Sequence, residues 1–555
     1  MTALIFENAK ILTFDRDRPT AEAIAIDGNT ITAVGNADEV RAAAPHAQRI
    51  DLQGACLIPG FNDTHAHMER EGLKSLRPSL AGASSIADIL AIVRAATATT
   101  PPGEWIVTMP AGTPPFFFDG VSALAEKRLP NRYELDAAAP DHPIYIQGVF
   151  GNWGKPPGHT ALNSRALALS GIGPDTRARI KGVEIERDAA GVPTGIIIEH
   201  NNRPTVEFDI LPAVPRFGFD HRLEGIRRSQ RLYNAQGTTS IYEGHGSAAE
   251  TISVYRRLWE LNELTVRAGL VVSPSWSDLT EARRIMRDWL ASARGSGLGD
   301  RWLRVSGIHI AYGGDPVVAC CARAHLPDTG WSGFVEQAVT PSDFREACFL
   351  AAEFDLRLHT IVGDQLHEII PVLQAVNERT PITTRRWVIE HIGRARPEDI
   401  RALKQLGVHV TTISTYYLWK GGHKYLDEAD GGDGGDGVVP HRTILDAGIP
   451  LAIATDNIPY DPFFTLWTTC VREERTTGRV IGPNQRLDAH TALELFTAAG
   501  AALTFDEGWK GRLRPGFVAD IAVLTDDPTT LPPSQLKDLD CLLTVIDGRI
   551  IHDNR

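Results

Sequence analysis

Short apolar runs alternate with amphipathic stretches through most of the chain. The amphipathic stretches, such as residues 220–236, 340–354 and 396–407, repeat their apolar positions with the period of a helix. In the last of them, Pro397 stands where a first helical turn accepts proline and Gly407 stands where a helix ends. The apolar runs predict short buried strands at residues 56–63, 238–244, 266–273, 303–310, 356–361, 386–391, 408–414 and 450–456.

Strands that alternate with helices in this way pair in parallel. Eight such units predict an α/β fold, a closed (β/α)8 barrel of the TIM type. Residues 70–215, approximately, separate the first predicted strand from the second, and this is far longer than a connection between a strand and a helix requires. They contain strands and Gly/Pro turns of their own, so we expect an inserted subdomain.

Both ends of the chain are rich in β-forming residues. Turn signals at Asp27-Gly28-Asn29 and Asp547-Gly548 separate some of these runs. Two β-rich ends that flank a long middle predict one small β-sandwich domain built from both termini. The predicted limits are residues 1–58 and 498–555 for the sandwich and residues 59–497 for the barrel with its insertion.

Composition and charge narrow the choice of partners. The chain has 555 residues, with 43% hydrophobic and 23% charged residues, as in an ordinary soluble globular protein. A formal net charge of -13 argues against nucleic acid and anionic membrane surfaces. Six cysteines without C-x-x-C spacing favour free thiols, and there is no long apolar segment or signal peptide. We expect a cytoplasmic protein, a homo-oligomer such as a dimer, that acts on a small molecule.

Ionisable residues collect at the predicted carboxyl ends of the strands, where barrel enzymes carry their chemistry. His65 and His67 are two residues apart, so on a strand they point to the same side. Buried ionisable groups in such a mouth are costly unless they are paired or bound to metal, which favours a divalent cation over hydrogen-bonded strand ends. His309 is the least certain in register, because it could stand one position away from the mouth. The candidate ligands are His65, His67, His309, His359, His391 and Asp456.

Two further groups are candidates for substrate contacts. Glu243 and His245 also stand at a strand end, where substrate contact, support of a ligand and ligation are all open interpretations. Several loops carry aromatic residues, which favour an apolar or aromatic substituent on the substrate if they line the cavity and which otherwise pack in the core. The aromatic candidates are Phe117, Tyr416, Tyr417, Trp419 and Tyr460.

The chain resembles the metal-dependent amidohydrolase superfamily over nearly its whole length, and within it the branch that contains N-substituted formamide deformylases. The motifs that carry the resemblance are "PGFNDTHAH", "RYELDAAAPDHPIYIQ", "GHTALNSRALALSGI", "PTGIIIEH", "LHTIVGDQ", "VIEHIGRARPEDI", "ATDNIPYDPF" and "GRLRPGFVADIAVL". The resemblance implies zinc or a similar divalent ion. The residues that it implies as ligands are His65, His67, His359, His391 and Asp456.

One departure from the family bears on the number of metal ions. Many relatives use a carboxylated lysine on the fourth strand to bridge two ions, and this chain has His309 in the corresponding stretch. A neutral imidazole ligates one ion but does not bridge two as a carbamate does. We expect one tightly bound ion, with a second, weaker one as the alternative.

The implied activity is hydrolysis of a carbon–nitrogen bond, of the amide or formamide type, in a substrate with an apolar or aromatic group. The ion would lower the pKa of water from ~15.7 towards ~7. Asp456 would act as the general base, and His391 would help to polarise the carbonyl group. One alternative keeps the barrel and changes the reaction to ester, carbamate or lactone hydrolysis or to a metal-assisted non-hydrolytic step. Another is a binding protein without catalysis, which would have no need of Asp456.

Overall fold

The computed structural model describes residues 3–149, 156–200, 205–314, 317, 319–320 and 339–555. Its largest sheet contains eight parallel strands, each beside the next barrel strand along the chain. The short antiparallel β16 (Leu298–Gly299) pairs with β17. The eight are β8 (Phe61–Asp63), β14 (Thr238–Ser247), β15 (Arg267–Val272), β17 (Leu303–His309), β18 (Leu358–Gly363), β19 (Val388–Ile392), β20 (His409–Thr412) and β21 (Leu451–Ile453). The predicted parallel α/β barrel is confirmed.

The first and last strands of the barrel meet through hydrogen bonds next to their ends. The Asp456 amide donates to the carbonyl oxygen of His65 at 2.9 Å. The Thr64 hydroxyl donates to the Ile453 carbonyl oxygen at 3.2 Å. Two residues predicted to belong to the site therefore lie on the two sides of the seam between β8 and β21.

Helices follow the strands, and their ends obey the local rules that the sequence predicts. Helix α13 begins with Pro397 and ends at Gly407, whose left-handed φ of 62° suits glycine. Thr340 caps α11 by accepting from the Asp343 amide. Apolar side chains of these helices pack on the outer faces of the strands. The helices of this part are α7 (Phe219–Asn234), α8 (Ala249–Glu260), α9 (Leu279–Asp288), α11 (Pro341–Glu353), α12 (Leu366–Arg379), α13 (Pro397–Leu406), α14 (Leu426–Ala429), α15 (His441–Asp446), α16 (Pro462–Val471), α17 (Ala489–Phe496) and α18 (Ala498–Leu503).

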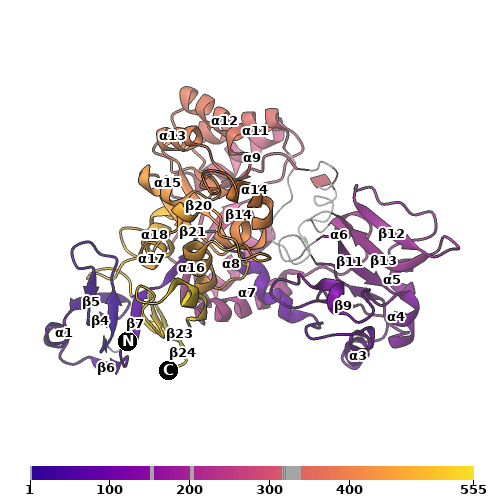
Figure 1. Ribbon diagram of the computed structural model, residues 1–555, viewed down its shortest axis with the longest axis horizontal. Helices are drawn as coiled ribbons and strands as arrows, with labels where there is room; N and C mark the ends of the chain where they lie inside the picture. Colours follow the sequence, from indigo (N-terminus) through magenta and orange to yellow (C-terminus); the bar gives the residue numbers. More distant parts are fainter. Residues whose placement is uncertain (1–2, 150–155, 201–204, 315–316, 318, 321–338) are drawn as a thin grey trace. The chain divides into compact units, whose positions relative to one another are not determined.

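The two ends of the chain form a β-sandwich, as predicted, and both termini lie there in Figure 1. Strand β7 of the N-terminal segment pairs antiparallel with β22 of the C-terminal segment. One sheet holds β5 (Thr30–Gly35), β4 (Ala23–Asp27), β1 (Leu4–Glu7) and β6 (Gln48–Asp51), and helix α1 (Ala37–Ala43) follows β5. The other holds β24 (Arg549–Asp553), β23 (Cys541–Ile546), β22 (Ile521–Leu524), β7 (Cys56–Pro59), β2 (Lys10–Leu12) and β3 (Thr20–Ala21).

The predicted strand at residues 56–63 is two strands, β7 in the sandwich and β8 in the barrel, with Gly60 between them. A Cβ at Gly60 would lie 2.3 Å from the Thr239 side chain, so only glycine lets the chain pass this close to β14. A single residue therefore links the two cores.

A buried ion pair also ties the barrel to the sandwich. Arg267 on β15 donates from Nε to Asp520 at 2.7 Å and from a terminal nitrogen to Asp547 at 3.0 Å. Arg267→Ala leaves the buried Asp520 carboxylate without its cation and is expected to cost about 3–5 kcal/mol in the free energy of unfolding. Urea unfolding followed by circular dichroism measures this cost. Arg283→Ala, which breaks an exposed pair with Glu353, should cost no more than about 1 kcal/mol, and equal costs would contradict the role assigned to Arg267.

The insertion forms a compact unit of its own, built on Glu69–Ile226, with a separate apolar core. Helix α4 begins with a capping box formed by Asn131 and Glu134. The sheet order is β12 (Val183–Arg187), β13 (Pro193–Glu199), β11 (Gly158–Leu162), β10 (Ile144–Ile146), β9 (Ile106–Thr108). The helices are α2 (Met68–Glu71), α3 (Ile86–Thr97), α4 (Arg132–Ala138), α5 (Ser164–Leu169) and α6 (Thr205–Asp209). The domain limits predicted from the sequence stay predictions.

The described helices include none that is both long and apolar enough to cross a membrane. Free thiols are confirmed for Cys56, Cys320, Cys348, Cys470 and Cys541. Cys321 lies outside the described residues.

Candidate metal centre

Three strands bring four of the predicted ligands together at the carboxyl ends of the barrel strands. His65 and His67 follow β8, His391 lies in β19, and Asp456 follows β21. All four are buried, with at most 5% of their surface exposed. His65, His391 and Asp456 form a group whose potential ligand atoms all lie within 4.8 Å of one another. The cluster that the sequence predicts is thus assembled in the structure.

The distances between the donor atoms match those around a tetrahedral ion. His391 Nε2 lies 3.1 Å from His65 Nε2. Asp456 Oδ1 lies 3.6 Å from His65 Nε2 and 3.0 Å from His67 Nε2. Ligand atoms about 2.0–2.1 Å from a tetrahedral zinc ion are roughly 3.3 Å from one another. These three successive separations are close to that value, and His65, His391 and Asp456 also lie mutually within 4.8 Å, so these three can share one ion.

Left-handed backbone conformations turn two of these side chains into the cluster. His391 has a φ of 57° and Asp456 a φ of 54°, which non-glycine residues adopt at a cost of about 1–3 kcal/mol. On a regular strand, neighbouring side chains point to opposite faces. The turn at His391 breaks this alternation, so that Glu390 and His391 both contact His65.

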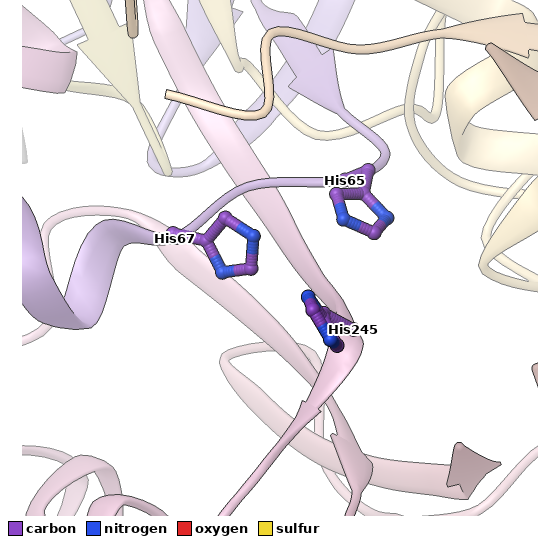
Figure 2. A group of neighbouring side chains, drawn as sticks. All are labelled: His65, His67 and His245. Atoms are coloured by element: carbon purple, nitrogen blue, oxygen red, sulfur yellow. The ribbon is translucent and has the colours of Figure 1, made fainter. Parts of the chain in front are cut away.

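His245 joins the same cluster from strand β14. Its ring centroid lies 6.1 Å from that of His65 and 5.6 Å from that of His67. These three histidines form a second group that could hold an ion, and Figure 2 shows their rings turned towards a common space. Of the roles left open by the sequence, ligation therefore has direct geometric support for His245.

Glu243 lies behind His67. Its Oε2 is 3.8 Å from His67 Nδ1, and its Oε1 accepts a hydrogen bond of 2.6 Å from the Tyr255 hydroxyl. The carboxylate thus faces the ring nitrogen of His67 that does not face Asp456. Support of His67 fits this position, and ligation also stays open because Glu243 belongs to a third group that could hold an ion.

His309 and His359 lie side by side on β17 and β18. The His309 ring is 5.0 Å from that of His245. His359 Nδ1 lies 3.0 Å from Glu390 Oε1, and its Nε2 lies 3.0 Å from the Tyr242 hydroxyl. Within the described part of the chain, neither histidine belongs to the groups whose donor atoms are close enough to share an ion.

Burial keeps His309, His359 and His391 neutral near pH 7, which is the form that binds metal. Burial and then the neighbouring His65 and His391 lower the pKa of His309 to about 3. Burial lowers the pKa of His359 to about 4, although the hydrogen bond to Glu390 acts in the opposite direction. Burial, with His65 beside it, holds the pKa of His391 well below its ordinary value.

The aromatic candidates divide into two sets. The rings of Tyr416 and Tyr417 lie 6.3 and 6.1 Å from the ring of His391. Burial and then the nearby Asp456 raise the pKa of Tyr416 to about 12, so its hydroxyl stays neutral. The others pack elsewhere: Trp419 against Phe464, Tyr460 against Tyr233, and Phe117 in the core of the insertion with Leu73, Met109 and Phe217.

Three residues near the cluster escaped prediction from the sequence. Glu390 is fully buried between His65 and His359, and Tyr242 reaches His359 from β14. Lys420 ends the π-helical turn Thr415–Lys420, and burial lowers its pKa to about 7 although Asp456 acts in the opposite direction. Only Glu390 had a signal in the sequence, since it directly precedes a candidate ligand.

The fold and the cluster together define a barrel enzyme of the metal-dependent hydrolase class. A family model described as "Amidohydrolase family" matches residues 48–552, and an imidazolonepropionase-like composite domain of bacteria matches residues 23–47. The chain belongs to the amidohydrolase family. It is an enzyme that hydrolyses carbon–nitrogen bonds.

Relatives match the chain from end to end. N-substituted formamide deformylase of Arthrobacter pascens is 25% identical over 99% of this chain and 98% of its own length. Putative amidohydrolase YtcJ of Bacillus subtilis (strain 168) is 22% identical over 99% of both chains. These matches confirm the resemblance inferred from the motifs.

Solved structures share the fold. An uncharacterised metal-dependent hydrolase from Pyrococcus horikoshii OT3 has a TM-score of 0.68 at 19% identity, covering 96% of this chain and 99% of that one. Atrazine chlorohydrolase TrzN from Arthrobacter aurescens TC1, crystallised with zinc, has a TM-score of 0.50 at 16% identity, covering 99% and 95%. At these identities the likeness establishes the fold alone.

Proposed function

We propose that this enzyme hydrolyses an amide or formamide that carries an apolar or aromatic group, at a single zinc ion held by His65, His67, His391 and Asp456. The observation that carries the proposal is a row of four buried donor atoms. His67 Nε2 lies 3.0 Å from Asp456 Oδ1, which lies 3.6 Å from His65 Nε2, and this atom lies 3.1 Å from His391 Nε2. His245 lies beside His65 and His67, with which it forms a second group of possible donors. The zinc in the structure of atrazine chlorohydrolase supports the choice of ion.

The number of ions follows from the donor set. Of the three groups of described residues that could hold an ion, two contain His65 and therefore share this one imidazole. His309 replaces the bridging lysine of many relatives, and a neutral imidazole does not bridge two ions. One ion per chain is therefore the proposed state.

Asp456 is the proposed general base. When bound, the zinc ion supplies Lewis acidity that lowers the pKa of water and polarises a carbonyl group. Asp456 accepts a proton from the attacking water and delivers it to the leaving nitrogen, which departs as a neutral amine. The left-handed backbone at Asp456 and the hydrogen bond from its backbone amide to the His65 carbonyl oxygen hold the carboxylate beside His65 and His67.

The proposed substrate class rests on two observations. Tyr416 and Tyr417 flank His391, so a substituent next to the reacting carbonyl group would meet aromatic surface. The relative that is 25% identical over almost the whole chain is named for N-substituted formamides. A formamide with an aromatic substituent on nitrogen satisfies both.

A matched pair of substrates tests the proposal. Zinc-loaded enzyme should convert N-(2-phenylethyl)formamide and water to 2-phenylethylamine and formate, measured by release of primary amine. The formate ester of 2-phenylethanol differs only in the leaving atom and serves as the comparison. Turnover of the ester or of a carbamate, with no amine released from formamides or other amides, would contradict the proposed reaction and favour ester or carbamate hydrolysis.

A further inference from the structure

The turn after barrel strand β20 carries a lysine near the metal centre, and the proposed chemistry gives this lysine no role. The turn is the π-helical segment Thr415–Lys420. Three of its side chains are buried, those of Thr415, Tyr417 and Leu418. The other three keep partial exposure, those of Tyr416, Trp419 and Lys420. A molecule that enters this part of the barrel mouth can therefore meet an aromatic ring and an amine on the same turn.

Hydrogen bonds hold the turn in place. The Thr415 hydroxyl lies 3.0 Å from the hydroxyl of Thr468 on helix α16. The amide of Gly421, the residue after Lys420, donates to the Tyr416 carbonyl oxygen at 2.8 Å. The backbone on both sides of the lysine is thus fixed, so its side chain starts from a defined position.

Tyr416 links the lysine to the metal centre. Lys420 Nζ lies over the Tyr416 ring, 5.2 Å from its centroid, where a cation is attracted to an aromatic face. The same ring lies 6.3 Å from the ring of His391, a proposed metal ligand. Lys420 and His391 are therefore both neighbours of one tyrosine, and a substrate bound at the metal would extend towards the amine along that ring.

The electrostatics around Lys420 favour a negatively charged visitor. Burial lowers the pKa of Lys420 to about 7, Asp456 acts in the opposite direction, and the nearby cations Lys424 and Arg475 act with burial. An opposite charge in contact with a buried ammonium group offsets the cost of removing it from water. In the proposed function Asp456 serves the ion and the attacking water. A carboxylate on the substrate is a group that can meet the lysine instead.

We propose that Lys420 and Tyr416 bind the nitrogen substituent of a substrate in which a carboxylate stands next to an aromatic group, as in an N-formyl aromatic amino acid. The ammonium group donates a charge-assisted hydrogen bond to the carboxylate. The Tyr416 ring packs against the aromatic group. This inference rests on the proposed function and deepens it, because it names an anionic class of substrate. Lys420 is then a residue that determines specificity.

Three formamides that share a phenylethyl group test the inference. N-(2-phenylethyl)formamide has no further substituent, N-formylphenylalanine adds a carboxylate, and N-formylphenylalaninamide adds a neutral carboxamide of similar size. Release of formate by the zinc-loaded parent gives kcat/KM for each compound, with enantiomers measured separately. We expect one enantiomer of N-formylphenylalanine to exceed both neutral compounds about 10–100-fold, as a hydrogen bond between charged groups typically contributes.

Substitutions at Lys420 assign the preference to its charge. Lys420→Met keeps an unbranched side chain without charge and should bring kcat/KM for the carboxylate to within a few-fold of that for the carboxamide. Lys420→Arg keeps the charge and should retain the preference. Lys424→Met is the matched control, because Lys424 is an exposed cation of the same loop, and it should leave the ratio unchanged. Loss of folded enzyme lowers both rates alike, so it does not move this ratio.

Binding to the metal-free protein gives a second readout that does not depend on turnover. Isothermal titration calorimetry with N-formylphenylalanine and N-formylphenylalaninamide measures the two dissociation constants. The parent should bind the carboxylate more tightly than the carboxamide, and Lys420→Met should lose this difference. Thermal midpoints show whether each variant is folded, and Lys420→Gln takes the place of Lys420→Met if the latter is not.

The outcomes separate this inference from the proposed function. Equal kcat/KM and equal dissociation constants for the carboxylate and the carboxamide in the parent would overturn the role of Lys420. A preference for the carboxylate that survives in folded Lys420→Met would overturn it as well. If no formate were released from any of the three compounds, while the parent bound the carboxylate more tightly and Lys420→Met did not, the proposed function would fail and the anion site at Lys420 would stand.

Discussion

Replacement of Asp456 by asparagine should lower the turnover of zinc-loaded enzyme at least about 10²-fold, within the 10²–10⁴-fold that general acid–base catalysis typically contributes. Asparagine keeps the size and one carbonyl oxygen of the side chain but cannot take a proton from water at neutral pH. Zinc content should fall far less than in a histidine variant, because three imidazoles of the cluster remain. The measurement is kcat on the preferred amide at matched zinc occupancy.

A neighbouring aspartate provides the control for this substitution. Asp461 caps helix α16 by accepting from the amides of Phe463 and Phe464. Asparagine caps helices as well as aspartate does, so Asp461→Asn should keep both activity and stability near those of the parent. If zinc-replete Asp456→Asn turned over substrate within a few-fold of the parent, another group would have to be the base.

His65→Ala should remove both bound zinc and activity. His65 Nε2 faces His391 and Asp456, and two of the three groups of described residues that could hold an ion include this histidine. The Lewis acidity of a metal is worth several kcal/mol in the transition state, so turnover should fall at least about 10³-fold. Metal analysis after gel filtration should give well below one ion per chain.

Two comparisons make the result specific. His46→Ala, at an exposed position of the sandwich, should leave zinc content and turnover unchanged. Circular dichroism should report an intact fold for His65→Ala, because the barrel core does not depend on the metal. Full zinc content in a folded His65→Ala protein would contradict the ligand assignment.

The barrel and the sandwich could be predicted because each strand is a short apolar run and each helix carries its own start and stop signals. The candidate ligands His65, His67, His391 and Asp456 could be found from the same pattern. In a parallel barrel, the carboxyl ends of all strands meet at one mouth, so residues far apart in the chain converge there. The position of a residue relative to the end of its strand therefore carried the prediction.

What the pattern could not supply was the direction of individual side chains. Regular alternation places Glu390 and His391 on opposite faces of β19, and the left-handed turn at His391 is not encoded by any glycine or proline. The partners of His359 were hidden for a related reason, because Tyr242 comes from a strand more than a hundred residues away. The resemblance to relatives implies a ligand's role for His359, and its two ring nitrogens lie 3.0 Å from Glu390 Oε1 and from the Tyr242 hydroxyl.

The aromatic residues were predicted least well. An aromatic side chain in a loop after a strand can line a cavity or pack on a helix, and composition does not distinguish the two. Tyr416 and Tyr417 lie beside His391, whereas Trp419 packs edge-on against Phe464 and Tyr460 stacks on Tyr233. Only tertiary packing separates these neighbours in the sequence.

The most direct test of the account is anomalous diffraction at the zinc absorption edge from crystals of the active, zinc-loaded enzyme. The account predicts one strong peak enclosed by the Nε2 atoms of His65, His67 and His391 and by the carboxylate of Asp456. A peak of comparable height at a different set of residues, or active crystals with no peak among these four, would contradict it.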